Sequence, residues 1–324
     1  MRQDQDQRID WEKWFGGNAD QRNQNLHAAA DVLDRWIRHV IREGLARIEH
    51  SNQEAIATTL TDLQAPALAQ RVRELNFEGD TPEEWENLLE ELSLLALWIH
   101  ALNKPPEKVS FALSLRQWAG VTIRKNTVRQ HGRRESGTWY VWGTHTEMLE
   151  TGLRAQRIWL QEVTSQTWAL ILDFAYGQSS LQTPLETGVC YDLELCFYPE
   201  AIPLRAIIAD QSGENTFTAP PELAHDTDSL LNQYATRLSV WPWLAQFPTG
   251  WTKARIHRPV REGEPWLAAD EEGAALPLRL GQPEGWELFA FACGSPVQLF
   301  GEWDGQAFLP LTARQTNGQH LTLS

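Results

Sequence analysis

The sequence predicts an α+β protein, in which an N-terminal helical bundle is followed by a β-rich domain with mostly antiparallel strands. Up to about residue 120, apolar residues recur at steps of three and four, which is typical of amphipathic helices. From Thr138 onward, apolar and polar residues alternate, as in strands with one buried face. A basic run separates the two patterns. The predicted parts are a polar leader, a helical domain, a basic connector and a β-rich domain, at residues 1–22, 23–122, 123–137 and 138–324.

The first predicted helix covers residues 26–48. Its apolar stripe is formed by Leu26, Ala30, Leu33, Ile37, Val40, Ile41, Gly44 and Ile48. A second helical stretch begins near Asn52. Pro66 restarts it, because proline is accepted in the first turn of a helix.

The clearest helix start in the sequence is at Thr81. Thr81 is a suitable N-cap residue, Pro82 suits the first helical position, and Glu84 completes a capping box. The helix that begins here ends before Pro105. A shorter helix up to about Gly120 completes the predicted bundle.

The β-rich domain is predicted from runs of aromatic and aliphatic residues. The expected strands are residues 139–148, 157–163, 168–176 and 189–197, with short strands from residue 253 to the end. A helix is expected near residues 226–238. The pair Asp304-Gly305 predicts a hairpin turn.

The strand at residues 189–197 alternates most clearly. Its odd positions are apolar, and we expect them to face the core. Its even positions are Cys190, Asp192, Glu194 and Cys196, which are all side chains that can bind metals. The two cysteines lie about 20 Å apart along a regular strand, too far to share a zinc ion or to form a disulfide. We therefore expect a solvated or half-covered face.

Composition favours a soluble cytoplasmic protein. The 324 residues are 42% hydrophobic and 22% charged, as in ordinary globular proteins. No apolar run reaches the roughly 18 residues that span a bilayer, and the polar start is unlike a secretory signal. The three cysteines predict no disulfide framework. A net charge of -15 repels phosphate backbones, so nucleic-acid binding would require a local basic patch.

The main catalytic signatures are missing from the sequence. It has no phosphate loop of the Walker type, no G-x-G-x-x-G turn and no G-x-S-x-G elbow. His145 and Glu147 match half of a zinc-deaminase signature, but the Pro-Cys-x-x-Cys half does not occur. We therefore expect no catalytic centre, no cofactor and no bound metal.

An enzyme of unrecognised type is an alternative that the sequence leaves open. Acid or base residues that are scattered along the chain can converge in a fold. The candidates are Asp173, Asp192, Glu194, His145 and Glu302.

The basic run in the connector is a candidate site for a partner or for phosphate groups. Basic side chains in such a run can bind phosphates, an acidic helix or an acidic patch of a partner. The candidates are Arg124, Lys125, Arg129, Arg133 and Arg134. A solvated connector is the alternative interpretation.

A tryptophan cluster is the second candidate for recognition. Tryptophan is both the residue richest in binding hot spots and one that is usually buried. Trp241, Trp243 and Trp251 are therefore predicted either to anchor a partner or to pack in the core.

Several segments of the sequence resemble, in their order and spacing, the region that follows the zinc finger in bacterial SWIM zinc finger family proteins. They are residues 31–36, 64–69, 157–160, 168–174, 197–199, 203–206 and 299–305. The segment from Trp11 to Arg22 also resembles the tryptophan-bearing segment found just after that finger. The resemblance covers nearly the whole chain.

The zinc finger itself is missing from the sequence. A SWIM finger needs C-x-C followed by C-x-H to close a tetrahedral zinc site. Cys190, Cys196 and Cys293 form neither arrangement, so no zinc ligand is carried over. We expect the finger to be encoded immediately upstream or supplied by another polypeptide.

The resemblance implies an accessory role in bacteria, in systems with MoxR-type AAA+ ATPases and von Willebrand factor A (VWA) proteins. We therefore expect a non-catalytic adaptor that binds other proteins, with a MoxR-type AAA+ ATPase or a VWA protein as the candidate partners. A nucleic-acid-binding protein that uses residues 124–134 is the first alternative, and the unrecognised enzyme is the second.

Overall fold

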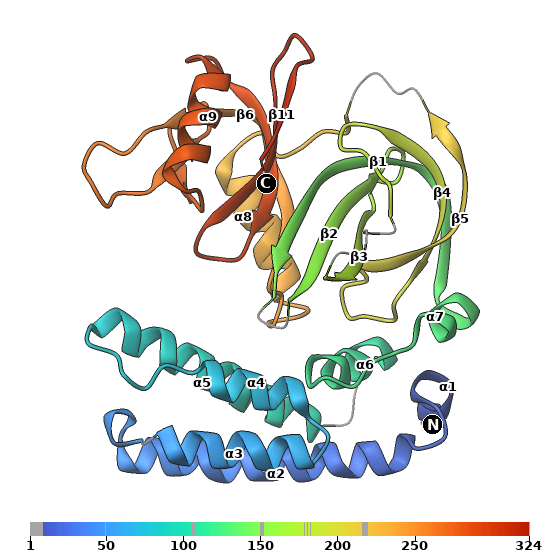
Figure 1. Cartoon of the computed structure of the whole chain (residues 1–324), viewed down its shortest axis with the longest axis vertical. Coiled ribbons are helices and arrows are strands. Elements are labelled where there is room, and N and C mark those ends of the chain that lie inside the picture. The colour runs from blue at the N-terminus through green and yellow to red at the C-terminus, as the bar shows by residue number, and fades with distance from the viewer. Residues whose placement is uncertain are drawn as a thin grey trace, which may run out of the picture. The chain divides into compact units, whose positions relative to one another are not determined.

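The computed structural model describes residues 9–48, 50–104, 108–149, 152–177, 179, 181, 183–215 and 220–323. The chain divides into two compact units. The helical unit comprises Met1–Gly132 with Pro199–Ala201, and the β unit comprises Arg133–Tyr198 with Ile202–Ser324. Figure 1 shows the helical unit in blue to green and the β unit in green to red. The α+β class predicted from the sequence is confirmed.

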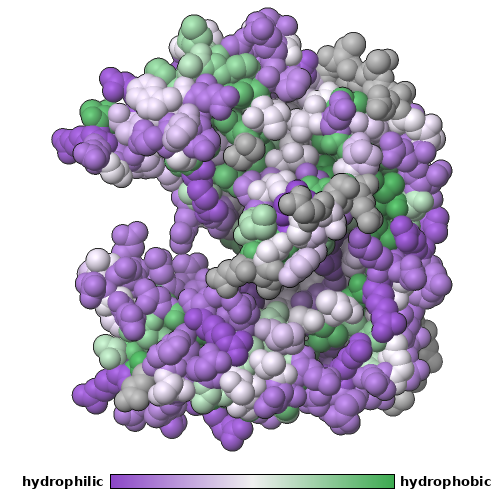
Figure 2. Space-filling model, in the orientation of Figure 1, coloured by the Kyte–Doolittle hydropathy of each residue, from purple (hydrophilic) through white to green (hydrophobic). Residues whose placement is uncertain are grey.

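The helical unit is built from helices whose apolar faces pack together. They are α1 (Trp11–Phe15), α2 (Ala19–Glu43), the 3-10 helix η1 (Leu45–Arg47), α3 (His50–Asp62), α4 (Pro66–Glu74), α5 (Pro82–Leu102), α6 (Val109–Trp118) and α7 (Lys125–His131). The side of this unit seen in Figure 2 is mainly hydrophilic. This is expected of helices that bury one stripe and expose the other.

The capping box predicted at Thr81 is present. The Thr81 hydroxyl accepts a hydrogen bond from the Glu84 backbone N–H at 3.3 Å, and the Glu84 carboxylate accepts one from the Thr81 N–H at 2.9 Å. Pro82 occupies the first turn of α5, as Pro66 does in α4. Local sequence signals therefore determine where these two helices begin.

The described part of the predicted leader is helical and packs on the bundle. The Arg116 guanidinium of α6 stacks 3.7 Å from the Trp11 ring centre and donates to the Asn23 side chain at 2.6 Å. Burial lowers the pKa of Arg116 to about 10, which still leaves it charged at neutral pH. Phe15 is buried at the end of α1. Residues 9–22 are thus held by specific contacts.

Gln53 of α3 supports the end of α4. Its side-chain amide donates to the backbone carbonyl groups of Val72 at 2.6 Å and Leu75 at 2.9 Å. The last carbonyl groups of a helix lack partners within the helix. Gln53 is buried and supplies the missing donor.

The β unit begins with a closed barrel. Its strands are β1 (Arg133–Met148), β2 (Leu153–Glu162), β3 (Trp168–Tyr176), β4 (Cys190–Phe197) and β5 (Arg205–Asn215), in the order β1-β2-β3-β5-β4. The β3–β5 pair is parallel and the other pairs are antiparallel. A five-stranded barrel with this order is of the OB type. Helix α7 and the start of β1 occupy most of the predicted connector.

Strand β4 shows the predicted alternation, but its other face is more buried than expected. Tyr191, Leu193, Leu195 and Phe197 pack in the barrel interior as predicted. Cys190 and Cys196 are also buried, whereas Asp192 and Glu194 are half-buried. Burial and the charge of Asp192 raise the pKa of Cys190 to about 11, so this cysteine remains a thiol at neutral pH.

A second sheet packs beside the barrel. Its strands are β6 (Phe247–His257), β7 (Trp266–Ala269), β8 (Ala275–Leu278), β9 (Val297–Trp303), β10 (Phe308–Arg314) and β11 (His320–Thr322), in the order β11-β10-β8-β7-β6-β9. Strand β9 also pairs with β10, through the hairpin predicted at Asp304. Helices α8 (Thr227–Leu238) and α9 (Gln282–Ala292) pack on this sheet (Figure 1).

Aromatic rings join the barrel to the second sheet. The ring of Phe300 on β9 stacks on Trp142 of β1 at 5.1 Å and on Trp168 of β3 at 5.5 Å. A β-bulge between Val141 and Gly143 lets the Trp142 carbonyl accept a hydrogen bond from the Thr312 hydroxyl at 2.7 Å. A side chain at Gly143 would meet β10, since its Cβ atom would lie 2.9 Å from Leu311 Cβ.

A buried ion pair crosses the same contact. The two carboxylate oxygens of Glu302 on β9 accept hydrogen bonds from Arg157 of β2 at 2.9 and 3.0 Å. The Trp159 indole N–H donates to the same carboxylate at 2.7 Å, and Arg157 also pairs with Glu147 at 2.7 Å. Burial is the largest single influence and lowers the Arg157 pKa, but Glu302 and Glu147 together outweigh it and raise the pKa.

None of the helices within the described ranges is long and apolar enough to cross a bilayer.

Replacing Gln53 by Ala should destabilise the helical unit, because the carbonyl groups at the end of α4 lose a buried donor. We expect a loss of about 1–3 kcal/mol in the free energy of unfolding, measured by urea denaturation. Gln70→Ala is the matched control, since Gln70 is an exposed α4 residue whose side-chain bond within the described ranges is to the surface residue Glu74. Equal losses for the two variants would contradict the assigned role.

Replacing Glu302 by Gln should leave the buried Arg157 charge without its main counter-ion. We expect a loss of about 3–5 kcal/mol in the free energy of unfolding. Glu271→Gln removes an exposed partner of Lys253 and should change stability little. If Glu302→Gln unfolded at the same urea concentration as the unsubstituted chain, the stabilising role of Glu302 would be contradicted.

Candidate binding groove

The basic residues predicted as a site are divided between the two units. Arg124 is the N-cap residue of α7, and Lys125 and Arg129 lie on that helix. Arg124 also lines a cavity of about 360 Å³ in the helical unit, together with Lys13 and Arg22.

The other two basic candidates lie on β1 and have acidic partners. Arg133 pairs with Glu135 at 2.5 Å, and its guanidinium lies 4.4 Å from the Phe197 ring centre. Arg134 pairs with Glu194 on β4 at 3.0 Å. These carboxylates compensate the charges of both arginines.

The three candidate tryptophans differ in exposure. Trp241 is half-buried and its ring lies 4.7 Å from that of the buried Trp243. Trp251 is fully buried, packs against Phe308 at 4.9 Å and donates its indole N–H to Thr227 at 3.2 Å. Trp251 therefore belongs to the core of the second sheet and offers no surface to a partner.

The candidate acid and base residues converge only in part. His145 and Glu302 lie in one electrostatic cluster with Arg157. Burial lowers the pKa of His145, and the charge of Arg157 adds to this effect. Asp173 accepts a backbone hydrogen bond from Thr183 at 2.9 Å.

The two acidic candidates on β4 bind neighbouring strand residues instead. Asp192 accepts a hydrogen bond from the Thr138 hydroxyl at 2.8 Å, and Glu194 pairs with Arg134. Within the described ranges, no group of three or more His, Cys, Asp or Glu side chains is placed to hold a metal ion.

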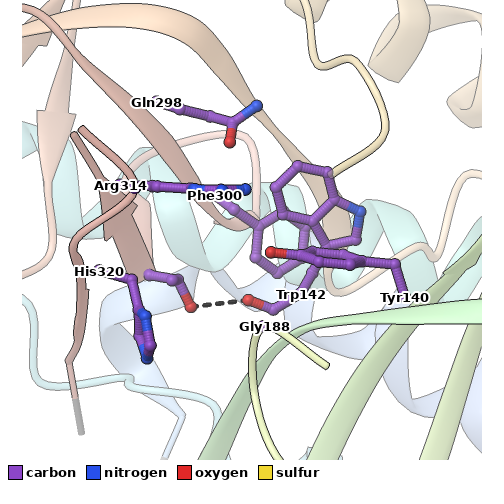
Figure 3. A pocket seen from close by; sticks show the side chains of 9 residues that line it. Tyr140, Trp142, Gly188, Gln298, Phe300, Arg314 and His320 are labelled. Atoms are coloured by element: carbon purple, nitrogen blue, oxygen red, sulfur yellow. Dashed lines mark hydrogen bonds between the residues drawn. The ribbon is translucent and has the colours of Figure 1, made fainter. Parts of the chain in front are cut away.

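The structure shows a pocket that the sequence did not indicate, where the barrel meets the second sheet (Figure 3). Its volume is about 100 Å³. Tyr140 and Trp142 of β1 and Phe300 of β9 form its aromatic wall, and all three are buried. The remaining lining residues are Gly188, Gln298, Thr312, Arg314, Gly318 and His320.

Two glycines of the lining adopt left-handed backbone conformations. Gly188 and Gly318 have φ angles of +85° and +91°, a conformation that L side chains rarely adopt. A Cβ atom on Gly318 would lie 4.0 Å from the Arg314 guanidinium, and one on Gly188 would lie 4.0 Å from the His320 ring. A substitution at either position would thus strain the backbone rather than clash with Arg314 or His320.

A wider pocket adjoins the first one. It has a volume of about 390 Å³ and shares Gln298 and Arg314 with the smaller pocket. Its other lining residues are Pro220, Thr252, Lys253, Glu271, Pro296, Gln315 and Thr316. We call the two pockets together the groove.

The groove is positively charged although the protein carries a net charge of -15. Glu271 is the acidic residue in its lining, and Lys253 pairs with it at 3.1 Å. Arg314 forms no ion pair with a carboxylate in the part of the chain that the structure describes. Its described polar contact is with the Tyr140 hydroxyl.

The Tyr140 hydroxyl remains a hydrogen-bond donor at neutral pH. Burial raises the pKa of Tyr140, and the positive charge and hydrogen bond of Arg314 offset this only in part. The groove therefore offers a phenol O–H, a guanidinium and the Gln298 amide as donors. Such donors bind an anion.

Comparison with known proteins identifies part of the helical unit. Residues 21–118 match the family model of the SWIM-associated four-helix bundle domain. No curated protein and no solved structure matches the chain. The matched region runs from the first turn of α2 to the end of α6. It contains residues 31–36 and 64–69, the first two of the segments that resemble SWIM proteins. The family resemblance is thus confirmed over residues 21–118, where the chain carries a region like the SWIM-associated four-helix bundle domain.

Proposed function

We propose that this chain is a non-catalytic adaptor of the cytoplasm, which binds a partner protein in the groove of its β unit. The observation that carries the proposal is the Arg314 guanidinium beside the Tyr140 hydroxyl, without a carboxylate partner among the described residues. Arginine and tyrosine are among the residues most enriched at the hot spots of protein interfaces. An acidic or carboxylate-bearing segment fits this combination.

The barrel gives less support to nucleic-acid binding. OB-type barrels bind oligonucleotides on the outer face of β2 and β3. Here Trp159 of β2 and Trp168 of β3 contact Glu302 and Phe300 of the second sheet on that face. The acidic net charge and the paired Arg134 also oppose binding to phosphates.

The cluster around Glu302 supports a structural role more than a catalytic one. Both of its carboxylate oxygens bind Arg157, and its side chain is 3% exposed. A general acid or base must reach a substrate proton. Buried ion pairs of this kind also shift pKa values without taking part in catalysis.

The SWIM-associated region suggests which partners to test first. A MoxR-type AAA+ ATPase and a VWA protein are the partners that the family resemblance implies, and we propose them as the first candidates. The helical unit then contributes the family-specific region, and the β unit contributes the groove.

A photo-crosslinking residue at Thr316 should form an adduct with a protein in native cells, because this exposed position lines the wider pocket. Mass spectrometry of the adduct would identify the partner. Adding Arg314→Glu should reduce the adduct at least tenfold, since it reverses the charge of the groove. The matched control is the same crosslinker at Val260, an 86% exposed position outside the groove.

The result would refute the proposed function if the adduct at Thr316 contained nucleic acid and disappeared after nuclease treatment. An equal yield of the same protein adduct at Val260 and Thr316 would also refute it. Thermal unfolding of each variant confirms that the fold is retained.

A further inference from the structure

We propose that the groove recognises the free C-terminal carboxylate of its partner, with the last residues of the partner chain lying in the wider pocket. This inference rests on the proposed function and specifies the chemistry of the partner. In this arrangement the C-terminus of the partner chain lies in the smaller pocket.

The donors around the smaller pocket fit a carboxylate. Arg314 has a planar fork of N–H groups that matches the two oxygens of a carboxylate. Tyr140 and Gln298 add an O–H and an N–H₂ donor from the opposite strands β1 and β9. Figure 3 shows Gln298 and Arg314 on one side of the pocket, with the Tyr140 ring across from them.

The aromatic wall strengthens such an ion pair. Tyr140, Trp142 and Phe300 are 6%, 2% and 1% exposed, so little water reaches the inner side of the pocket. Attraction between opposite charges is stronger where the surroundings are less polar. Burial also raises the pKa of Tyr140, which keeps its hydroxyl able to donate to an anion.

The sizes of the two pockets favour a chain terminus. The smaller pocket holds about 100 Å³, well below the roughly 300–1,000 Å³ of pockets that enclose a whole small ligand. The wider pocket, of about 390 Å³, adjoins it along Gln298 and Arg314. A peptide in the wider pocket can therefore place its end, but not a continuing chain, beside Arg314.

The lining of the wider pocket suits the residues that precede the terminus. Pro220 and Pro296 provide apolar surface. Lys253 and Glu271 are exposed and already paired with each other, at 3.1 Å. This pocket therefore contributes contact area rather than a second strong charge, and the carboxylate at Arg314 gives the orientation.

Affinity selection tests this inference with the full chain. The immobilised chain is exposed to a synthetic mixture of random hexapeptides with free C-termini and, separately, to the same mixture with amidated C-termini. Retained peptides are sequenced by mass spectrometry, and their dissociation constants are measured by calorimetry. We expect amidation to weaken binding at least tenfold, which corresponds to about 1.4 kcal/mol.

Three variants assign the effect to the groove. Arg314→Gln should abolish the preference for the free carboxylate. Tyr140→Phe removes one donor but keeps the ring, and it should weaken binding by several fold. Arg261→Gln is the control, because Arg261 is exposed and lies outside the groove lining.

The inference is overturned if amidated peptides bind equally well, if no peptide is retained, or if Arg314→Gln binds like the unsubstituted chain. Retention that depends on an internal Asp or Glu would also overturn it. In each of these cases a protein adduct at Thr316 would leave the proposed adaptor function standing. The two proposals therefore fail separately.

Discussion

The β unit depends on the buried contact between Glu302 and Arg157, because it fixes how β9 lies across the barrel. Alternate residues of a strand share one face. On β9, Gln298, Phe300 and Glu302 are spaced in this way: Glu302 pairs with β2, Phe300 stacks on Trp142, and Gln298 reaches the rim of the groove. The ion pair that joins the two sheets thus also positions the binding surface.

The bulge in β1 serves the same arrangement. Up to and including the bulged residue Trp142, Tyr140 and Trp142 face the second sheet, while Trp139 and Val141 fill the barrel. Beyond it the register changes by one residue, so that His145 lies opposite Arg157. Strand β1 can therefore place Tyr140 and Trp142 at the groove and still pair with β2 opposite Arg157 of the ion pair. A bulge changes which positions face outward without interrupting the sheet.

The sequence indicates the helices more fully than it indicates the groove. Thr81 and Glu84 are close in sequence, so their capping box can be recognised without a fold. The groove instead combines Tyr140, Gly188 and Arg314, which lie on segments that only the folded sheets bring together. For the same reason the sequence could not show whether Trp251 is buried or exposed. Its burial depends on contacts with Phe308 and Thr227, which are distant from it in the sequence.

One strand pairing of the barrel is much shorter than the others. Strands β3 and β5 are joined by the register pairs of Leu170 with Arg205 and Ile171 with Ala206, whereas every other seam of the ring is longer. Local opening starts where the fewest hydrogen bonds must break. The barrel can therefore open locally between β3 and β5, while β1 and β2 keep their contacts with β9. The Arg157–Glu302 ion pair, which joins β2 to β9, would keep its partners during such an opening.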